Sequence, residues 1–185
     1  MLPVIVGGLI GISGGLSGTF LSSWLRAKDD RRNVHREKLE TTVTYLAELE
    51  NWGTRLRHQY LFDLAQETYE PNPAAKILAL TAIHFPSLHA LAEDLDAAAD
   101  KYELALMAKK QQMLEAGTQA MKRAADALVA ANPADPTIVE RMKLAATEAK
   151  IAAVEDTEVI HDAYAAVLVQ RKTLLTEAQK LAANL

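Results

Sequence analysis

Apolar residues recur every three or four positions along most of this chain, which is the spacing of one buried helix face. The pattern predicts three long helices over residues 33–68, 86–131 and 136–182, with a short helix over residues 74–83. Prolines lie at each boundary, where they end one helix or begin the next. Nothing between Trp24 and Asn33 breaks a helix, so the first long helix is expected to continue from the segment before it.

Each long helix has a predicted inward face. On the first it comprises Leu39, Val43, Leu46, Leu49, Gly53, Leu56, Tyr60 and Leu64. On the second it comprises Leu91, Leu95, Ala98, Tyr102, Leu106, Lys109, Met113, Gly117, Ala120, Ala124 and Leu128. On the third it comprises Ile138, Met142, Ala145, Ala149, Ala152, Ile160, Ala163, Val167, Leu174 and Leu181.

Small residues on these faces predict narrow spacing between the helices. Alanine fills 26 of the 96 positions from Ala90 onward, and Gly53 and Gly117 both lie on predicted inward faces. Alanine also favours helices over strands. The short connection over residues 132–136 makes the two helices that it joins antiparallel neighbours. We therefore expect an all-α protein, an elongated antiparallel three-helix bundle or coiled-coil hairpin that follows an N-terminal transmembrane helix.

The first 25 residues carry no charge, and they predict the membrane segment. Leu2–Leu25 is a run of 24 residues, of which 12 are strongly apolar and six are glycine. About 20 predominantly apolar residues cross a bilayer as a helix. A cleaved signal peptide would carry basic residues before the apolar run, whereas here they follow it. Residues 1–25 are therefore predicted to be a transmembrane helix.

The residues that follow predict how this helix is oriented. Trp24 has the expected depth of a membrane interface, and Arg26, Lys28, Arg31 and Arg32 begin a basic juxtamembrane segment over residues 26–38. Basic flanks stay in the cytoplasm, so the N-terminus is predicted outside and the helical bundle of residues 39–185 inside. Anionic lipid headgroups are the expected contacts of this segment. The acidic residues Asp29, Asp30 and Glu37 dilute its charge and count against more specific recognition of a lipid or nucleic acid.

Six small residues of the predicted span share one face, within an arc of about 100° on a helical projection. They are Gly7, Gly11, Gly14, Gly15, Gly18 and Ser22. Membrane helices associate through close backbone contact because lipid supplies no hydrophobic force between them. Each glycine also lowers helix propensity, so six small residues on one face, five of them glycine, predict a compensating contact. We expect this face to pack against a second copy or another membrane protein, with an incidental glycine-rich anchor as the alternative.

The chain offers little that resembles catalytic machinery. It has no cysteine, which excludes disulfides and thiolate chemistry. Glu158 and His161 form a single Glu-x-x-His pair, whereas a carboxylate-bridged di-iron site uses two such pairs with two further glutamates. We therefore predict no enzyme, no catalytic or metal-binding residues and no cofactor. The net charge of −4 argues against a general nucleic-acid-binding role.

Two features together suggest a family resemblance: the segment from Ala82 to Leu88, and the apolar span that ends at Trp24-Leu25 before a basic flank. The layout resembles uncharacterised bacterial single-span membrane proteins with an arginine-rich exit and an all-helical cytoplasmic domain. This chain departs from them in its acidic flank residues and in the His84-Phe85 pair at the aromatic position. The resemblance implies a single-pass protein of the bacterial inner membrane. It implies no activity.

The function favoured by these patterns is a membrane-anchored helical scaffold or accessory subunit that acts through protein–protein contacts. Its expected partners are a second copy or another membrane protein. One alternative is an oligomeric membrane pore or phage-type ejection component, because a span only half apolar is also suited to lining a channel. Another is an immunity or sensor protein whose helical domain binds a cognate toxin or ligand.

Overall fold

The computed structural model describes the backbone of residues 2–62, 71–131, 137–155 and 157–184, and their side chains except at residues 2–25, 27, 129, 131 and 155. Within these ranges the chain is helical and forms no strand. The elements are α1 (Leu2–Leu61), α2 (Pro73–His84), α3 (Pro86–Ala131), α4 (Ile138–Glu155) and α5 (Glu158–Ala183).

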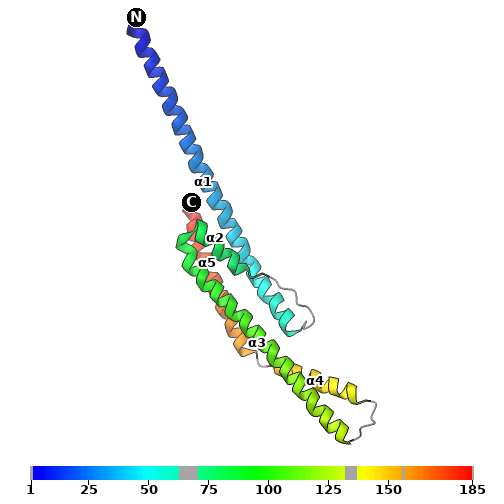
Figure 1. Cartoon of the computed structure of the whole chain (residues 1–185). Helices are drawn as coiled ribbons and strands as arrows, with labels where there is room; N and C mark the ends of the chain where they lie inside the picture. The colour runs from blue at the N-terminus through cyan, green and yellow to red at the C-terminus, as the bar shows by residue number, and fades with distance from the viewer. Residues whose placement is uncertain (1, 63–70, 132–136, 156, 185) are drawn as a thin grey trace.

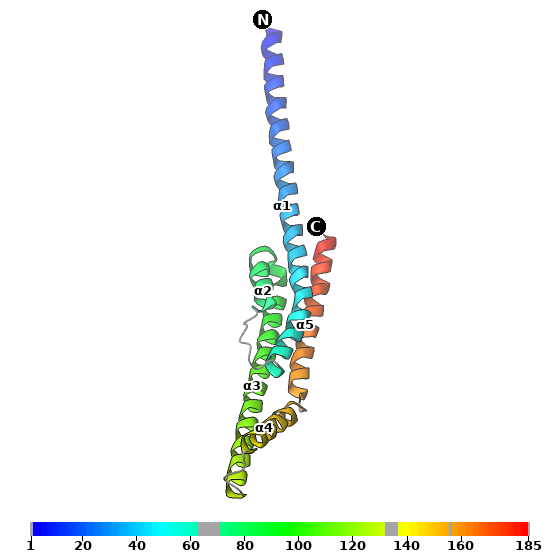
Figure 2. The same cartoon turned by 90° about the vertical axis from the view of Figure 1, so that its right-hand side faces the viewer.

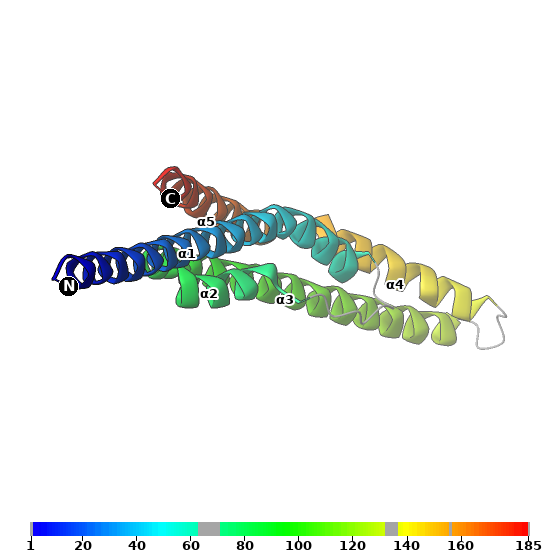
Figure 3. The same ribbon diagram turned by 90° about the horizontal axis from the view of Figure 1, so that it is seen from above.

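The helices form an elongated bundle from which the N-terminal half of α1 projects (Figure 1). The helices α2, α3 and α5 pack along the C-terminal half of α1, and α3 contacts each of the other four helices. The α3–α4 hairpin forms the end of the molecule farthest from the N-terminus, as Figures 2 and 3 show from two further directions. The expectation of an elongated all-helical bundle is therefore confirmed.

The core lies where α2, α3 and α5 pack against α1. Its largest fully buried side chains include Trp52, Tyr102, Leu46, Leu49, Ile77, Leu95, Leu106, Leu174 and Val167. The rings of Trp52 and Tyr102 meet edge to face with their centroids 6.3 Å apart. Most of these residues belong to the predicted inward faces, so helical periodicity located the core.

Both glycines on the inward faces lie at close helix contacts. A Cβ atom at Gly53 would stand 2.6 Å from Cε2 of Tyr164 on α5. A Cβ atom at Gly117 would stand 2.6 Å from Cε of Lys150 and 3.3 Å from the backbone oxygen of Ala146, both on α4. The prediction that small residues permit narrow spacing is confirmed at these two positions.

The second long helix and the short helix agree with prediction almost residue for residue. Helix α3 has the predicted bounds, and α2 extends the predicted 74–83 by one residue at each end. Asn72 caps α2, because its side-chain oxygen accepts a hydrogen bond from the backbone N–H of Ala74 at 2.9 Å. Pro73 then occupies the first helical position, where a missing N–H costs nothing.

The prediction of one long third helix is wrong. The chain instead forms α4 and α5, with Asp156 and Thr157 between them. Thr157 is the N-cap residue of α5 and makes no side-chain capping hydrogen bond, and threonine has a lower helix propensity than the alanines nearby. The break lets α4 pack on the distal part of α3 while α5 packs beside α1 (Figure 2). Ala152, predicted to face inward just before the break, is exposed.

Two details of the first helix also differ from prediction. Val43 is 37% exposed and Thr42 is buried in its place. The hydroxyl of Thr42 donates to the backbone oxygen of Lys38 at 2.9 Å, so burial leaves it satisfied. Helix α1 ends at Leu61, which is buried, and the next residue, Phe62, is 65% exposed. Residues 63–68, the rest of the predicted helix, lie outside the described residues. The predicted core residue Leu64 lies outside the described residues.

Candidate interaction surfaces

The basic juxtamembrane segment lies on the projecting part of α1. Arg26, Lys28, Arg31 and Arg32 are all exposed, as a segment that contacts lipid headgroups requires. The acidic Asp29 and Asp30 are exposed among them. Contact of these side chains with lipid headgroups stays a prediction.

The predicted span itself is part of α1, which runs without interruption from Leu2 to Leu61. Its small-residue face (Gly7, Gly11, Gly14, Gly15, Gly18 and Ser22) and Trp24 have side chains outside the described residues, so their packing stays a prediction. Among the residues that the structure does describe, no helix is long and apolar enough to cross a membrane.

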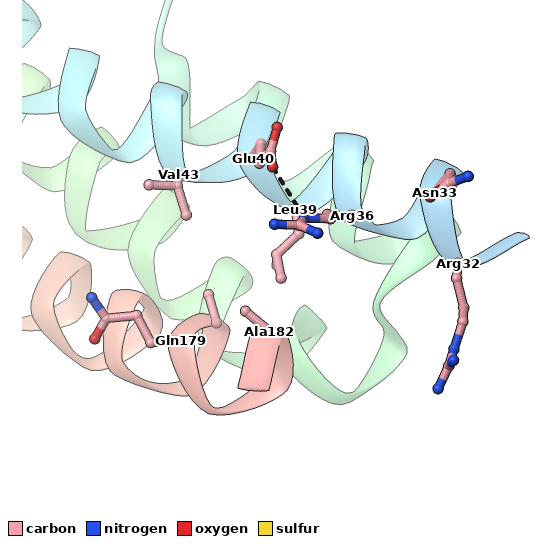
Figure 4. A pocket seen from close by; sticks show the side chains of 9 residues that line it. Arg32, Asn33, Arg36, Leu39, Glu40, Val43, Gln179 and Ala182 are labelled. Atoms are coloured by element: carbon pink, nitrogen blue, oxygen red, sulfur yellow. Dashed lines mark ion pairs between the residues drawn. The ribbon is translucent and has the colours of Figure 1, made fainter. Parts of the chain in front are cut away.

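A groove separates α1 from the C-terminal end of α5, close to the point where α1 leaves the bundle (Figure 4). Its volume is about 570 Å³. The floor is apolar and is formed by Leu39, Val43, Ala178 and Ala182. The polar residues that line it are Arg32, Asn33, Arg36, Glu40 and Gln179.

The charges around this groove largely compensate one another. Nε of Arg36 lies 3.5 Å from Oε1 of Glu40, and both side chains are more than two thirds exposed. An ion pair that exposed contributes little to stability. The backbone carbonyls at the end of α5 add partial negative charge beside the two arginines. The groove therefore carries no strong excess of one sign, and its chemistry does not single out an anionic ligand.

Two side chains of α5 donate hydrogen bonds to backbone oxygens of α1. Nε of Arg171 donates to the oxygen of Leu46 at 2.6 Å, and its Nη2 lies 3.5 Å from Oε2 of Glu50. The hydroxyl of Tyr164 donates to the oxygen of Glu50 at 3.3 Å. These bonds fix how α5 sits on α1. Helical spacing alone gives no signal for them.

The largest exposed apolar residues of α3 gather on its distal two thirds. Leu104 is 63% exposed, Met107 43%, Leu114 41% and Met121 40%. Sequence reasoning missed this surface because it sought the single best inward face of each helix. The signal that finds it is a second apolar series on α3 with spacings of three and seven residues.

The enzyme-like pair identified from the sequence lies at the start of α5. Glu158 and His161 are both exposed at the start of α5. In the described part of the chain, no group of three or more histidine, cysteine, aspartate or glutamate side chains is placed to hold a metal ion.

The histidines at the α2–α3 corner have structural contacts. The ring of His35 on α1 meets the rings of His84 and Phe85, with centroids 6.5 and 5.9 Å away. His89 pairs with Glu93 at 3.5 Å, the spacing of four residues expected for an exposed helix pair. This corner therefore joins α1 to the turn between α2 and α3.

Comparison with known proteins adds no assignment. No family model matches the chain, and no curated protein or solved structure is significantly similar to it.

Proposed function

We propose that this protein is a membrane-anchored helical scaffold or accessory subunit that acts through protein–protein contacts. Residues 2–25 would cross the bacterial inner membrane with the N-terminus outside, and the bundle would project into the cytoplasm. The basic flank supports this direction. The side chains of Arg26, Lys28, Arg31 and Arg32 would meet anionic headgroups at the inner surface.

The observation that carries the proposal is the continuity of α1. One helix includes the uncharged segment, the exposed basic segment and the buried residues Leu46, Leu49 and Trp52. A bundle joined to a span in this way is held in a set orientation to the membrane, whereas a loop would leave it free to tumble. A fixed orientation is useful to a protein whose role is to present a surface.

The glycine-striped face would supply the contact inside the membrane. A repeat of small residues allows two helices to approach closely, and such packing drives association where lipid does not. The partner would be a second copy of this chain or the span of another membrane protein. The exposed apolar surface of α3 would supply a second contact, far from the membrane.

A charge placed inside the predicted span tests the anchoring. We expect the full chain, expressed in a bacterium, to stay in the membrane pellet after an alkaline carbonate wash. Ile12→Arg should release it, because an arginine at the centre of a spanning helix costs about 2.5–3.5 kcal/mol. Ile151→Arg is the matched control, since Ile151 is 60% exposed on α4 and should tolerate the charge.

Extraction of the unaltered chain by carbonate, or retention of Ile12→Arg at the control level, would contradict the proposal. The orientation has its own test, since the chain has no cysteine and an introduced thiol is unique. Thr54→Cys, at an exposed position of α1, should react with a membrane-impermeant maleimide only after the cells are permeabilised. Labelling in intact cells would reverse the proposed topology.

A further inference from the structure

Helix α3 carries a second periodic face in addition to its buried one. Its members alternate in spacing between three and four residues, and we call them the α3 seam: Leu104, Met107, Gln111, Leu114, Thr118 and Met121. All six are exposed. A period of 3.5 residues is the spacing of a coiled-coil interface, in which the a and d positions are ordinarily apolar. Leu104, Gln111 and Thr118 then occupy the a positions. Met107, Leu114 and Met121 occupy the d positions.

The α3 seam is distinct from the face that holds the bundle together. Tyr102, Leu106, Met113 and Gly117 form the buried face of the same stretch of α3. On a helical projection the seam residues lie roughly 70–170° around the axis from the centre of that face. Within the described residues no helix covers the seam, as its exposure shows. A periodic apolar surface of this length is typical of an interaction site.

We propose that a second copy of this chain docks on the α3 seam, with the two α3 helices parallel. The charges beside the seam complement themselves in this arrangement. Lys110 occupies a g position and Glu115 the e position five residues later. In a parallel pair, residue g of one helix faces residue e of the next heptad on the other. Lys110 of each copy therefore faces Glu115 of the second copy, and the pair forms twice.

The side chains of this charge pair are accessible in the single chain. Glu115 is exposed and accepts a hydrogen bond from Nε2 of Gln111 at 2.9 Å. Nζ of Lys110 lies 5.5 Å from the centroid of the Tyr60 ring and is partly exposed. In the single chain the ammonium group of Lys110 therefore lies at Tyr60 of α1.

The parallel direction rests on the proposed function. Two copies anchored in one membrane through α1 have the same orientation, so their α3 helices run the same way. Gln111 and Thr118 at a positions lower the stability of such a pair while fixing its register. Confinement to the membrane would offset that loss by raising the effective concentration of the second copy.

Disulfide crosslinking of the full chain tests both the surface and the direction. Met107→Cys and Met121→Cys each place one thiol on the seam, and Leu144→Cys places one on α4, where Leu144 is 59% exposed. With a mild oxidant, each seam variant should form disulfide-linked dimers, and Leu144→Cys should not. When Met107→Cys and Met121→Cys are expressed together, no crosslink between the two variants should form. In a parallel pair these positions are about 21 Å apart along the helix axis.

The charge pair is tested in the Met107→Cys background. Lys110→Glu should lose most of the crosslinked dimer, because it brings two glutamates together in each pair. Adding Glu115→Lys to Lys110→Glu should restore it, although this double variant still lacks the contact between Lys110 and Tyr60. Restoration therefore separates a contact between copies from a contact within one chain. Failure of the double variant to restore crosslinking would count against the charge pairing.

The results that overturn the inference are distinct from those that overturn the scaffold. A chain that stays in washed membranes but gives no seam crosslinks refutes this inference and leaves the anchoring intact. Crosslinks only between Met107→Cys and Met121→Cys refute the parallel direction. Crosslinks only to other proteins refute the second copy as occupant. A chain absent from the membrane refutes the proposed function, whatever the crosslinks show.

Discussion

The hydroxyl of Tyr102 on α3 donates a hydrogen bond to the backbone oxygen of Gly53 on α1 at 2.9 Å. Gly53 also admits the ring of Tyr164 from α5, and the two tyrosine rings lie with their centroids 5.1 Å apart. Three helices therefore meet at one residue that has no side chain. The orientation of the bundle on α1 depends on this contact.

Gly53→Ala should destabilise the bundle. The added Cβ atom would stand 2.6 Å from Cε2 of Tyr164, and the bulky ring has to move. Overpacking of this kind costs about 1–3 kcal/mol. The gain in helix propensity of up to about 1 kcal/mol offsets only part of it. Chemical denaturation of the full chain in detergent measures the loss.

Gly117→Ala provides the contrast to Gly53→Ala. Its added Cβ atom meets mainly the flexible side chain of Lys150, which can swing away. We expect a much smaller change in the free energy of unfolding than at Gly53. Equal losses at the two glycines would show that the tyrosine ring is not what makes Gly53 necessary.

Tyr102→Phe should lower the free energy of unfolding by about 0.5–1.5 kcal/mol, since it removes one buried hydrogen bond and keeps the ring. Burial, with the nearby Tyr164, raises the pKa of Tyr102 to about 12 from 10.0. The stability that the protonated Tyr102 hydroxyl contributes is therefore complete below pH 10 and is lost as the pH rises through about 12. The unaltered chain should lose stability over that alkaline range more steeply than Tyr102→Phe. Parallel pH profiles would contradict this account.

Arg171→Met should loosen α5 from α1. Methionine keeps much of the aliphatic length, so the change chiefly removes the bond to the Leu46 oxygen and the pairing with Glu50. A hydrogen bond from a charged donor is worth about 1.5–3 kcal/mol. Lys172→Met changes an exposed neighbour and should have little effect. Thermal unfolding of both variants checks the difference, and equal melting temperatures would exclude a role for Arg171.

Asp100→Asn should stabilise the protein at neutral pH and leave it unchanged in acid. Burial raises the pKa of Asp96 and of Glu103, and the charge of Asp100 raises both further. Groups with raised carboxyl pKa values contribute stability at low pH that is lost as the pH rises through those values. Asp100→Asn removes the repulsion between Asp100 and Asp96 and that between Asp100 and Glu103. Each repulsion lowers the free energy of unfolding at neutral pH by about 0.2–0.5 kcal/mol.

The control for this change is Asp94→Asn, at an exposed position of the same helix that is not a cause of either shift. Denaturation at pH 7 and at pH 3 separates the variants. A stabilising effect of Asp100→Asn that persisted at pH 3, where the raised pKa values of Asp96 and Glu103 leave these two groups protonated, would assign it to something other than charge repulsion.

Periodicity predicted the core of this fold because burial follows helix geometry. It placed Leu46, Leu49, Tyr102 and Leu106 correctly, and the prolines set the ends of α2 and α3. It failed between α4 and α5, where a run of alanines on both sides obscures the change of face. It also took Val43 for a core residue, since hydropathy alone does not show that the Thr42 hydroxyl can bond within its own helix.

The interaction surfaces were predicted less completely. Arg26, Lys28, Arg31 and Arg32 are exposed, as their charge leads one to expect, and their role at a membrane stays a prediction. The contacts of Arg171 and Tyr164 with α1 join residues more than a hundred positions apart, which no local pattern encodes. The α3 seam is periodic and was in principle visible, but only burial distinguishes it from the inward face of the same helix.

The central claim is that α1 runs without a break from the basic segment into the bundle, as anchoring by the predicted span requires, and a distance within α1 tests it most directly. Spin labels on Lys28→Cys and Thr54→Cys, both at exposed positions, report across the junction between the basic segment and the core. In the full chain reconstituted in bilayers we expect one narrow distribution near 39 Å, from about 1.5 Å for each residue. A broad distribution, or a mean distance well below this value, would show a break in α1 and contradict the account.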